Sequence, residues 1–320
     1  MSHLSQRRYP IGAELVASGT SFRVWAPDHD QVSLVLEGGA KLPLEAEENG
    51  YFSGVAAEAG AGTRYWFALG RDEIKLPDPA SRFQPDGVEG PSQVVDPAAF
   101  GWSDADWRGL ADSPVYYELH IGTFTPQGTF AAATEKLAWL KEIGITVVEV
   151  MPLNSFSGNF GWGYDGILLY APFAPYGSPD DVRRFVDHAH QLGIAVILDV
   201  VYNHFGPGEI CPQYAKAFFS DRPPNDWGRS MNFDGPDSGP VREFFCTNAA
   251  YWIEEFHFDG LRIDATQALL DKSEDHIIAE LARAARAAAG DRHILLVSEN
   301  ERQEPFQVRS PDKDGFGLDA

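Results

Sequence analysis

Arg262 and Asp264 are separated by a single residue, Ile263, at the end of a short apolar run that begins at Gly260. In a β-strand, side chains two positions apart point to the same side, so the guanidinium and the carboxylate are expected to meet. A neighbouring cation lowers the pKa of a carboxylate and keeps it ionised. An ionised carboxylate fixed at a strand end can act as a covalent nucleophile. A structural ion pair leaves the same pattern, so these two residues alone do not decide between the two roles.

A second carboxylate, Glu299, follows another apolar run, His293 to Val297. No basic residue lies within two positions of Glu299, so we expect its pKa to be free to rise and its carboxyl to serve as an acid. Two carboxyl groups about 5–5.5 Å apart carry out retaining glycoside hydrolysis, one attacking the anomeric carbon and the other protonating the leaving oxygen. The sequence therefore predicts Asp264 as nucleophile and Glu299 as acid.

Other polar side chains are expected near these strand ends. Asp199 and His204 follow the apolar run Ile194 to Val200, and Tyr164 lies in a long loop. Tyr164 could stack under the sugar whose bond is cut, with Asp199 and His204 holding its hydroxyls; for each residue singly, a structural hydrogen bond is about as probable. The chain has no His-x-x-x-His, Cys-x-x-Cys or calcium-loop spacing, so we expect no metal and no other cofactor.

From Ser113 onward, strand and helix patterns alternate, which predicts an α/β fold. The expected helices are 129–144, 178–193, 241–256 and 273–290, and the expected strands are 115–120, 146–151, 194–200, 260–263 and 293–297. The loops Pro152 to Tyr176 and Tyr202 to Gly239 are far longer than ordinary connections, and barrel enzymes build their sites from such loops. No glycine-rich phosphate loop follows the first strand, which disfavours a nucleotide-binding doubly wound sheet. We therefore predict a (β/α)₈ TIM barrel with about five of its strands present.

Residues 1 to about 105 show short branched and aromatic runs between turn residues, which predicts an all-β sandwich. Trp25 and Trp66 could stack on sugars, although core positions are more probable because both lie in strand patterns. The proline-rich stretch Leu76 to Pro97 is expected to be a linker. The predicted domains are thus 1–105, the sandwich, and 106–320, the barrel portion.

Composition narrows the class of partner. The 320 residues include 25 basic and 47 acidic side chains, a formal charge of −22. Such a charge opposes binding to nucleic acid or to an anionic membrane and favours a neutral small substrate. The two cysteines, Cys211 and Cys246, indicate a reducing compartment, and no signal-peptide or membrane-spanning pattern is visible. We expect a cytoplasmic protein.

Three of these stretches together resemble the α-amylase family of glycoside hydrolases: Asp199-Val-Val-Tyr-Asn-His204, Gly260-Leu-Arg-Ile-Asp264 and the strand end at Glu299. The resemblance implies that Asp264 is the nucleophile and Glu299 the acid/base. It also implies that the cleavage subsite is lined by Arg262, Asp199, His204 and Tyr164, with Trp162 and Asp165 in the same substrate-binding set.

Phe22-Arg-Val-Trp-Ala-Pro27 resembles the start of the glucan-binding-type β module that precedes the barrel in one branch of that family. Within that branch, four further stretches are similar to enzymes that release trehalose from maltooligosyl trehalose: Tyr117-Glu-Leu-His-Ile-Gly-Thr-Phe-Thr125, Trp162-Gly-Tyr-Asp-Gly166, Val201-Tyr-Asn-His-Phe-Gly-Pro207 and Asn232-Phe-Asp-Gly-Pro236. The alternatives are a glycogen debranching or branching enzyme and, in another class, a non-catalytic glucan-binding fragment.

The family's third catalytic carboxylate, in a His-Asp pair, has no match before Ala320. We therefore expect the chain to lack the C-terminal part of the same enzyme. The strands at 115–120 and 293–297 should then be open sheet edges that invite association with other chains.

Overall fold

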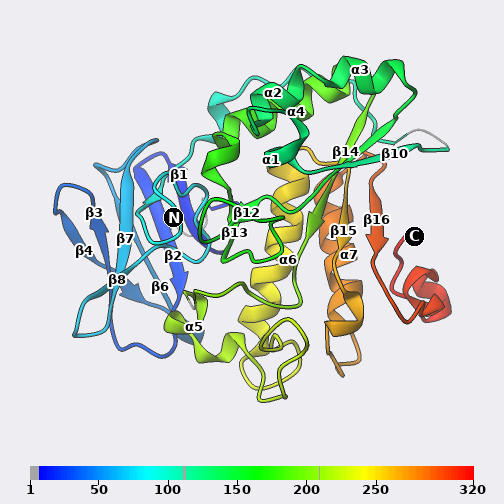
Figure 1. The fold of residues 1–320 in the computed structure, drawn as a ribbon. Coiled ribbons are helices and arrows are strands. Elements are labelled where there is room, and N and C mark those ends of the chain that lie inside the picture. The colour runs from blue at the N-terminus through cyan, green and yellow to red at the C-terminus, as the bar shows by residue number, and fades with distance from the viewer. Residues whose placement is uncertain (1–6, 111–112, 209) are drawn as a thin grey trace.

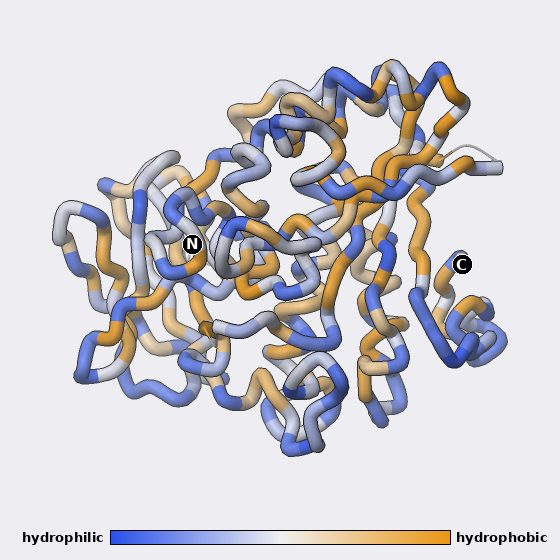
Figure 2. The backbone as a smooth tube through the Cα atoms, in the orientation of Figure 1, coloured by the Kyte–Doolittle hydropathy of each residue, from blue (hydrophilic) through white to orange (hydrophobic). Residues whose placement is uncertain are grey.

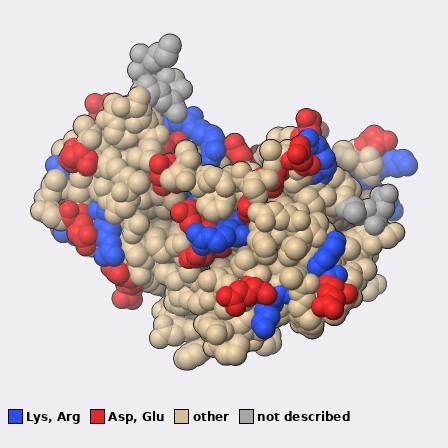
Figure 3. Space-filling view, turned by 90° about the horizontal axis from the view of Figure 1, so that it is seen from above, with Lys and Arg blue, Asp and Glu red and all other residues tan. Residues whose placement is uncertain are grey.

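The computed structural model describes residues 7–110, 113–208 and 210–320 of the chain. An all-β region from the N-terminal part lies beside a region in which strands and helices alternate (Figure 1). The strands of both regions carry long hydrophobic stretches (Figure 2). On the face drawn in Figure 3, Lys and Arg side chains lie next to Asp and Glu side chains. No helix in the described ranges is long and apolar enough to cross a membrane.

The alternating region is built on a five-stranded parallel sheet in the order β10-β11-β14-β15-β16, which confirms the five predicted strands. Every residue of β14 is buried, as expected for a strand covered on both faces. The strands are β10 (Tyr116–Leu119), β11 (Val147–Val150), β14 (Ala195–Val200), β15 (Gly260–Ile263) and β16 (Leu295–Ser298).

The predicted helices form with two corrections. Helix α4 (Pro179–Gln191) begins with a capping box between Ser178 and Asp181, and α6 (Ser238–Glu255) packs beside α7 (Ile277–Ala289). The predicted start of α7 at Ser273 is wrong, because Asp271 accepts the Ile277 N–H and draws residues 271–276 into a loop.

The helix predicted over 129–144 is broken into α2 (Phe130–Thr134) and α3 (Leu137–Glu142). The Thr134 hydroxyl donates to the Phe130 carbonyl oxygen at 2.8 Å, and the Lys136 N–H bonds the carbonyl of Ala133. A threonine hydroxyl that competes for a backbone carbonyl weakens the helical ladder, so the chain tightens there.

Two sheets make up the all-β region, which confirms its predicted class. Side chains of both sheets, among them Phe22, Leu34 and Phe67, share one apolar core. One sheet has the order β1-β2-β6-β5, from β1 (Gly12–Val16), β2 (Gly19–Trp25), β6 (Tyr51–Ala56) and β5 (Glu45–Ala46). The other has the order β4-β3-β7-β8, from β4 (Lys41–Pro43), β3 (Val32–Leu36), β7 (Arg64–Leu69) and β8 (Ile74–Leu76), with β9 (Ser92–Gln93) also paired to β7.

The two regions are joined by the long loops. The loop after β11 contains the hairpin β12 (Asn154–Ser155) and β13 (Leu168–Pro172), and Leu168 belongs to the core of the all-β region. The loop after β14 contains α5 (Cys211–Tyr214), whose Tyr214 hydroxyl donates to the Pro77 carbonyl at 2.9 Å. Trp25 is a core residue, packed edge-on against Phe218 of that loop. The long loops therefore fix the sheet against the all-β region.

The prediction of a linker over Leu76 to Pro97 is wrong. Asp78 is buried and accepts hydrogen bonds from the Tyr65 hydroxyl and the Ala80 N–H. Arg82 is also buried, with its guanidinium over the ring of Tyr251 at 4.4 Å. Prolines here shape a packed segment rather than a free connection.

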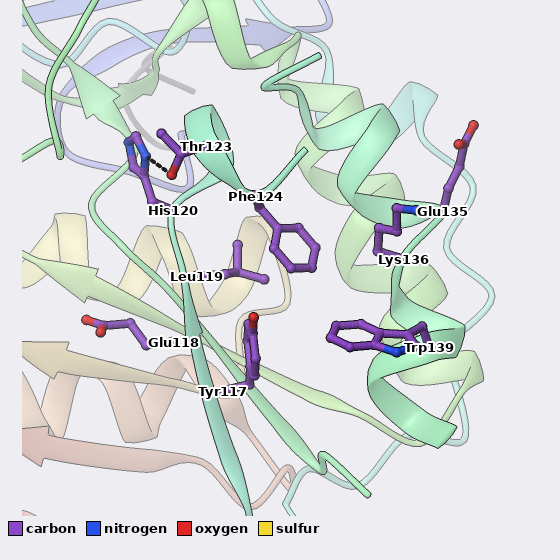
Figure 4. A pocket seen from close by; sticks show the side chains of 9 residues that line it. All are labelled: Tyr117, Glu118, Leu119, His120, Thr123, Phe124, Glu135, Lys136 and Trp139. Atoms are coloured by element: carbon purple, nitrogen blue, oxygen red, sulfur yellow. Dashed lines mark hydrogen bonds between the residues drawn. The ribbon is translucent and has the colours of Figure 1, made fainter. Parts of the chain in front are cut away.

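The two edges of the sheet differ. The outer side of β16 is partly paired, because the Ser298 N–H donates to the Ala320 carbonyl and the Asp319 N–H donates to the Leu296 carbonyl, both at 2.8 Å. The expectation of a fully open edge there is therefore wrong. At β10 an open hollow of about 750 Å³ lies between the strand and α3, where Tyr117 and Trp139 face each other (Figure 4). A short helix, α1 (Ile121–Phe124), closes one end of that hollow.

A buried histidine secures the amino-terminal end of the sheet. His190 Nδ1 lies 2.9 Å from Asp104 Oδ2, and its Nε2 lies 2.8 Å from Asp259 Oδ2. Both ring nitrogens must donate, so the ring is an imidazolium. Burial alone lowers the pKa of His190, but the hydrogen bonds and charges of the two carboxylates outweigh it and raise that pKa above 6.5. His257 also contacts Asp104, and Arg292 lies 3.6 Å from Asp259.

We expect His190→Gln to lower the free energy of unfolding by about 1.5–3 kcal/mol, because it removes the cation that hydrogen-bonds both Asp104 and Asp259 and leaves Asp259 only the longer contact with Arg292. The raised pKa means that this contribution is complete below the ordinary histidine value and is lost as pH rises through the folded-state value. Urea unfolding at about pH 6 and about pH 9 should therefore show a larger difference from wild type at the lower pH. His188→Gln, at the surface of the same helix, is the control; equal effects of the two variants would contradict the assignment.

Candidate active site

Arg262 stands at the centre of three carboxylates. Its Nη1 donates to Asp199 Oδ1 and Oδ2 at 2.9 and 2.8 Å and to Asp264 Oδ1 at 2.8 Å. Its Nη2 lies 3.2 Å from Glu299 Oε2. We call these four residues the Arg262 cluster. The predicted pairing of Arg262 with Asp264 is confirmed, and both predicted catalytic carboxylates lie against one guanidinium.

The register of the parallel sheet brings the cluster together. Asp199 of β14 lies opposite Arg262 of β15, and Arg262 lies opposite Val297 of β16. Asp264 and Glu299 directly follow the last residues of β15 and β16, at the carboxyl edge of the sheet. Their N–H groups continue the ladder, bonding the carbonyl oxygens of Val200 and Ile263 at 3.0 Å. Neighbouring strand ends thus place residues from three chain segments within reach of one side chain.

Asp199 is the fully buried member of the cluster. Besides Arg262 it accepts a hydrogen bond from the Tyr164 hydroxyl at 2.8 Å, which brings the loop after β11 to the strand ends. Burial raises the pKa of Asp199 to about 7, although Arg262 and Tyr164 oppose that change. Both carboxylate oxygens of Asp199 thus accept hydrogen bonds from protein groups, namely Arg262 and Tyr164.

Asp264 is partly buried, with 15% of its side chain exposed. Burial raises the pKa of Asp264 above its ordinary value, and the charge of Arg262 and a hydrogen bond from Asn203 offset only part of that effect. The predicted lowering is wrong in direction, because the sequence shows the cation but not the loss of water. The Asn203 amide donates to Asp264 Oδ2 at 2.9 Å. Sequence reasoning did not single out this contact, although Asn203 lies inside the stretch that ends at His204.

Glu299 is more open, with 43% of its side chain exposed. Its Oε2 accepts a hydrogen bond from the Ala265 N–H at 2.7 Å. Although no basic residue lies within two positions of Glu299 along the chain, Arg262 reaches it from the adjoining strand. Distance along the chain does not report neighbours across a sheet.

The remaining predicted residues differ in how deeply they are buried near the cluster. His204 is buried and its Nδ1 faces the side-chain oxygen of Asn203. Burial lowers the pKa of His204, although Asp264 and Asp165 oppose it. Asp165 is exposed, and so is Trp162, with 69% of its surface accessible. No contact recorded for the described residues joins Trp162 to the Arg262 cluster.

The cluster can perform acid–base and nucleophilic chemistry with its own side chains. Asp264 is partly buried and oriented by two donors, Arg262 and Asn203, whereas Glu299 has 43% of its side chain exposed. Within the described ranges, no group of three or more His, Cys, Asp or Glu side chains is arranged to hold a metal ion.

Arg262→Lys should lower the free energy of unfolding by about 1.5–3 kcal/mol, because a single ammonium cannot reproduce the guanidinium fork, whose Nη1 contacts Asp199 and Asp264 and whose Nη2 contacts Glu299. Urea unfolding measures the effect. Arg286→Lys is the control, since Arg286 pairs with Asp319 at the surface and such pairs contribute about 0–1 kcal/mol. A variant of Arg262 as stable as the control would show that the cluster does not depend on the fork.

Comparisons with known proteins agree with this geometry. Residues 93–233 match the family described as alpha amylase, catalytic domain. The chain is 45% identical over 305 residues to a malto-oligosyltrehalose trehalohydrolase of Deinococcus radiodurans, covering 94% of this chain and 49% of that protein. It is 40% identical over 311 residues to the Saccharolobus solfataricus enzyme of the same name, covering 97% and 54%.

Among solved structures, a putative alpha amylase from Salmonella typhimurium superposes with a TM-score of 0.88 and 43% identity, covering 92% of this chain and 50% of that one. The chain thus spans about half the length of the curated relatives it matches. The fold is the TIM-barrel glycosidase fold of the α-amylase family, with an all-β region and a parallel sheet of five strands. The chain therefore contains part of an α-amylase-family catalytic domain, and in sequence it corresponds to the N-terminal half of malto-oligosyltrehalose trehalohydrolases.

Proposed function

We propose that this chain is the N-terminal part of a retaining α-glucoside hydrolase that releases trehalose from maltooligosyl trehalose. The observation that carries the reaction type is the pair of carboxylates, Asp264 and Glu299, held by one guanidinium at adjoining strand ends. The names of the relatives supply the substrate.

In this proposal Asp264 attacks the anomeric carbon and forms a covalent glycosyl intermediate, while Glu299 protonates the departing glycosidic oxygen. Glu299 then takes a proton from the water that hydrolyses the intermediate. The exposure of the two carboxylates fits this division, because the acid must meet a leaving group and later a water molecule.

The surrounding residues have supporting roles. Asp199 is buried, so we assign to it the positioning of Arg262 and of Tyr164 rather than direct contact with sugar. Tyr164 stacks under the sugar at the cleavage position, and His204 binds a sugar hydroxyl as a neutral ring. Exposed Trp162 and Asp165 contact the sugars beyond it.

We also propose that the five strands are the first part of a (β/α)₈ barrel, and that the missing strand and helix units continue from β16 and close the barrel at the open side of β10. The hollow there is lined by Tyr117, Phe124 and Trp139, which suit burial against a helix. That part of the enzyme would carry the third catalytic carboxylate. Residues 1–105 form a sandwich module that binds glucan, and 106–320 form the barrel portion.

Product analysis of the full-length protein tests the activity. Incubation with maltooligosyl trehalose, glycogen and pullulan should release trehalose from the first and leave the other two nearly unchanged. Transfer of glucan chains or cleavage at α-1,6 branches, without trehalose, would instead identify a branching or debranching enzyme.

Substitution separates the two carboxylates. Asp264→Asn should remove the covalent intermediate and lower turnover by about 10⁴-fold or more on every substrate. Glu299→Gln should lower turnover on maltooligosyl trehalose by several orders of magnitude yet spare a substrate with an activated leaving group, which needs no proton. Near-normal turnover of Glu299→Gln on the natural substrate would contradict the acid assignment.

A further inference from the structure

The residue after the nucleophile has an unusual backbone. Ala265 is buried and lies in the left-handed region, with φ 42° and ψ 53°. Residues other than glycine rarely adopt this conformation, and such strain persists only where the surroundings impose it. This conformation is accompanied by a specific contact: the Ala265 N–H donates to Glu299 Oε2 at 2.7 Å. The strained residue thus links the strand end of Asp264 to the side chain of Glu299.

A buried polar network holds this conformation in place. The Thr266 N–H and the Thr266 hydroxyl both lie 2.9 Å from the Glu299 carbonyl oxygen. The same hydroxyl lies 2.9 Å from Ser298 Oγ and 3.0 Å from the side-chain oxygen of Gln307, and it accepts a hydrogen bond from Asn300. Thr266 and Gln307 are almost fully buried. Thr266 therefore fixes both the backbone of Ala265 and the main chain of Glu299.

The two oxygens of Glu299 have different surroundings. Oε2 faces the Ala265 N–H and lies 3.2 Å from Arg262 Nη2, so two groups that bear protons already point to it. A proton on Oε2 would be directed against an amide donor and a cation. No donor of the described residues is recorded at Oε1. The carboxyl can therefore hold a proton on Oε1 without displacing any contact.

We propose that the proton given to the leaving group is carried by Glu299 Oε1, and that Ala265 and Thr266 are positioning residues that fix this choice. This inference rests on the proposed hydrolase function. As the bond between the anomeric carbon and the glycosidic oxygen breaks, an Asp264 oxygen bonds the carbon and the proton moves from Oε1 to the departing oxygen. Glu299 is left as a carboxylate, with Oε2 still held by the Ala265 N–H, and recovers its proton from the hydrolytic water.

The test compares two substrates in the full-length enzyme. Maltooligosyl trehalose needs a proton on its leaving oxygen, whereas an α-maltooligosyl fluoride releases fluoride with little protonation. Thr266→Val keeps the shape of the side chain and removes its hydrogen bonds. We expect its kcat to fall about tenfold or more on maltooligosyl trehalose, since misplacing a catalytic group by about 1 Å can lower a rate by about 100-fold. On the fluoride, kcat should stay within about twofold.

Matched variants distinguish positioning from general damage. Thr266→Ser keeps the hydroxyl, so its kcat on maltooligosyl trehalose should equal that of the wild type. Ser298→Ala, a small truncation in the same network, should show the same substrate dependence to a smaller degree and provides the reading if Thr266→Val does not fold. Thr134→Val removes a threonine hydrogen bond in α2, far along the chain from the network, and should leave kcat unchanged on both substrates.

The outcomes separate this inference from the proposed function. Equal losses on both substrates in Thr266→Val and Ser298→Ala, or no loss on either, would overturn the positioning role alone. Selective loss in an enzyme that cleaves α-glucosides without releasing trehalose would support the inference and overturn the proposed substrate. A wild-type enzyme that cleaves neither compound would overturn both.

Discussion

The structure of this region depends on one guanidinium placed among more carboxylates than it can neutralise. Arg262 contacts Asp199, Asp264 and Glu299, and Asp199 is fully buried. Removing such charges from water is unfavourable unless geometry is good and the remaining polar atoms are satisfied. The strand register meets this condition, because β14, β15 and β16 are adjacent and parallel. The same imbalance leaves carboxyl groups whose protonation responds to their surroundings, which acid–base chemistry requires.

The loops complete what the strands begin. Tyr164 reaches Asp199 because its loop is anchored nearby: the Gly161 carbonyl oxygen lies 3.0 Å from His120 Nε2. Gly163 has φ +91°, and a Cβ there would meet the Pro152 carbonyl oxygen at 2.0 Å, so only glycine permits this approach. The same loops pack into the all-β region through Leu168 and Tyr214. The all-β region therefore helps to hold in place the loops that carry Tyr164 and His204.

Much of this arrangement could be predicted, for physical reasons that are visible in particular residues. The buried strands are apolar and end at polar residues, and Ser178 with Asp181 marks the start of α4. The parallel order then places Asp264 and Glu299 at one edge. Family resemblance added the roles, which the spacing of Arg262 and Asp264 alone leaves open.

What could not be predicted depends on contacts between distant segments. Arg262 reaches Glu299 across the sheet, and burial rather than charge sets the direction of the Asp264 pKa. The stretch from Leu76 to Pro97 looks like a linker because prolines are frequent in it, yet Asp78 and Arg82 are buried by partners remote in sequence. The hydroxyl of Thr134 divides a helix whose apolar pattern is continuous.

Trapping the reaction intermediate tests most directly whether the Arg262 cluster is a retaining glycosidase site with Asp264 as its nucleophile, as we propose. Incubating the full-length enzyme with 5-fluoro-α-glucosyl fluoride should trap the glycosyl intermediate, which peptide mass spectrometry can locate. We expect a single labelled peptide with the sugar attached to Asp264. A label on Glu299 or Asp199, or steady turnover with inversion at the anomeric carbon and no label, would contradict it.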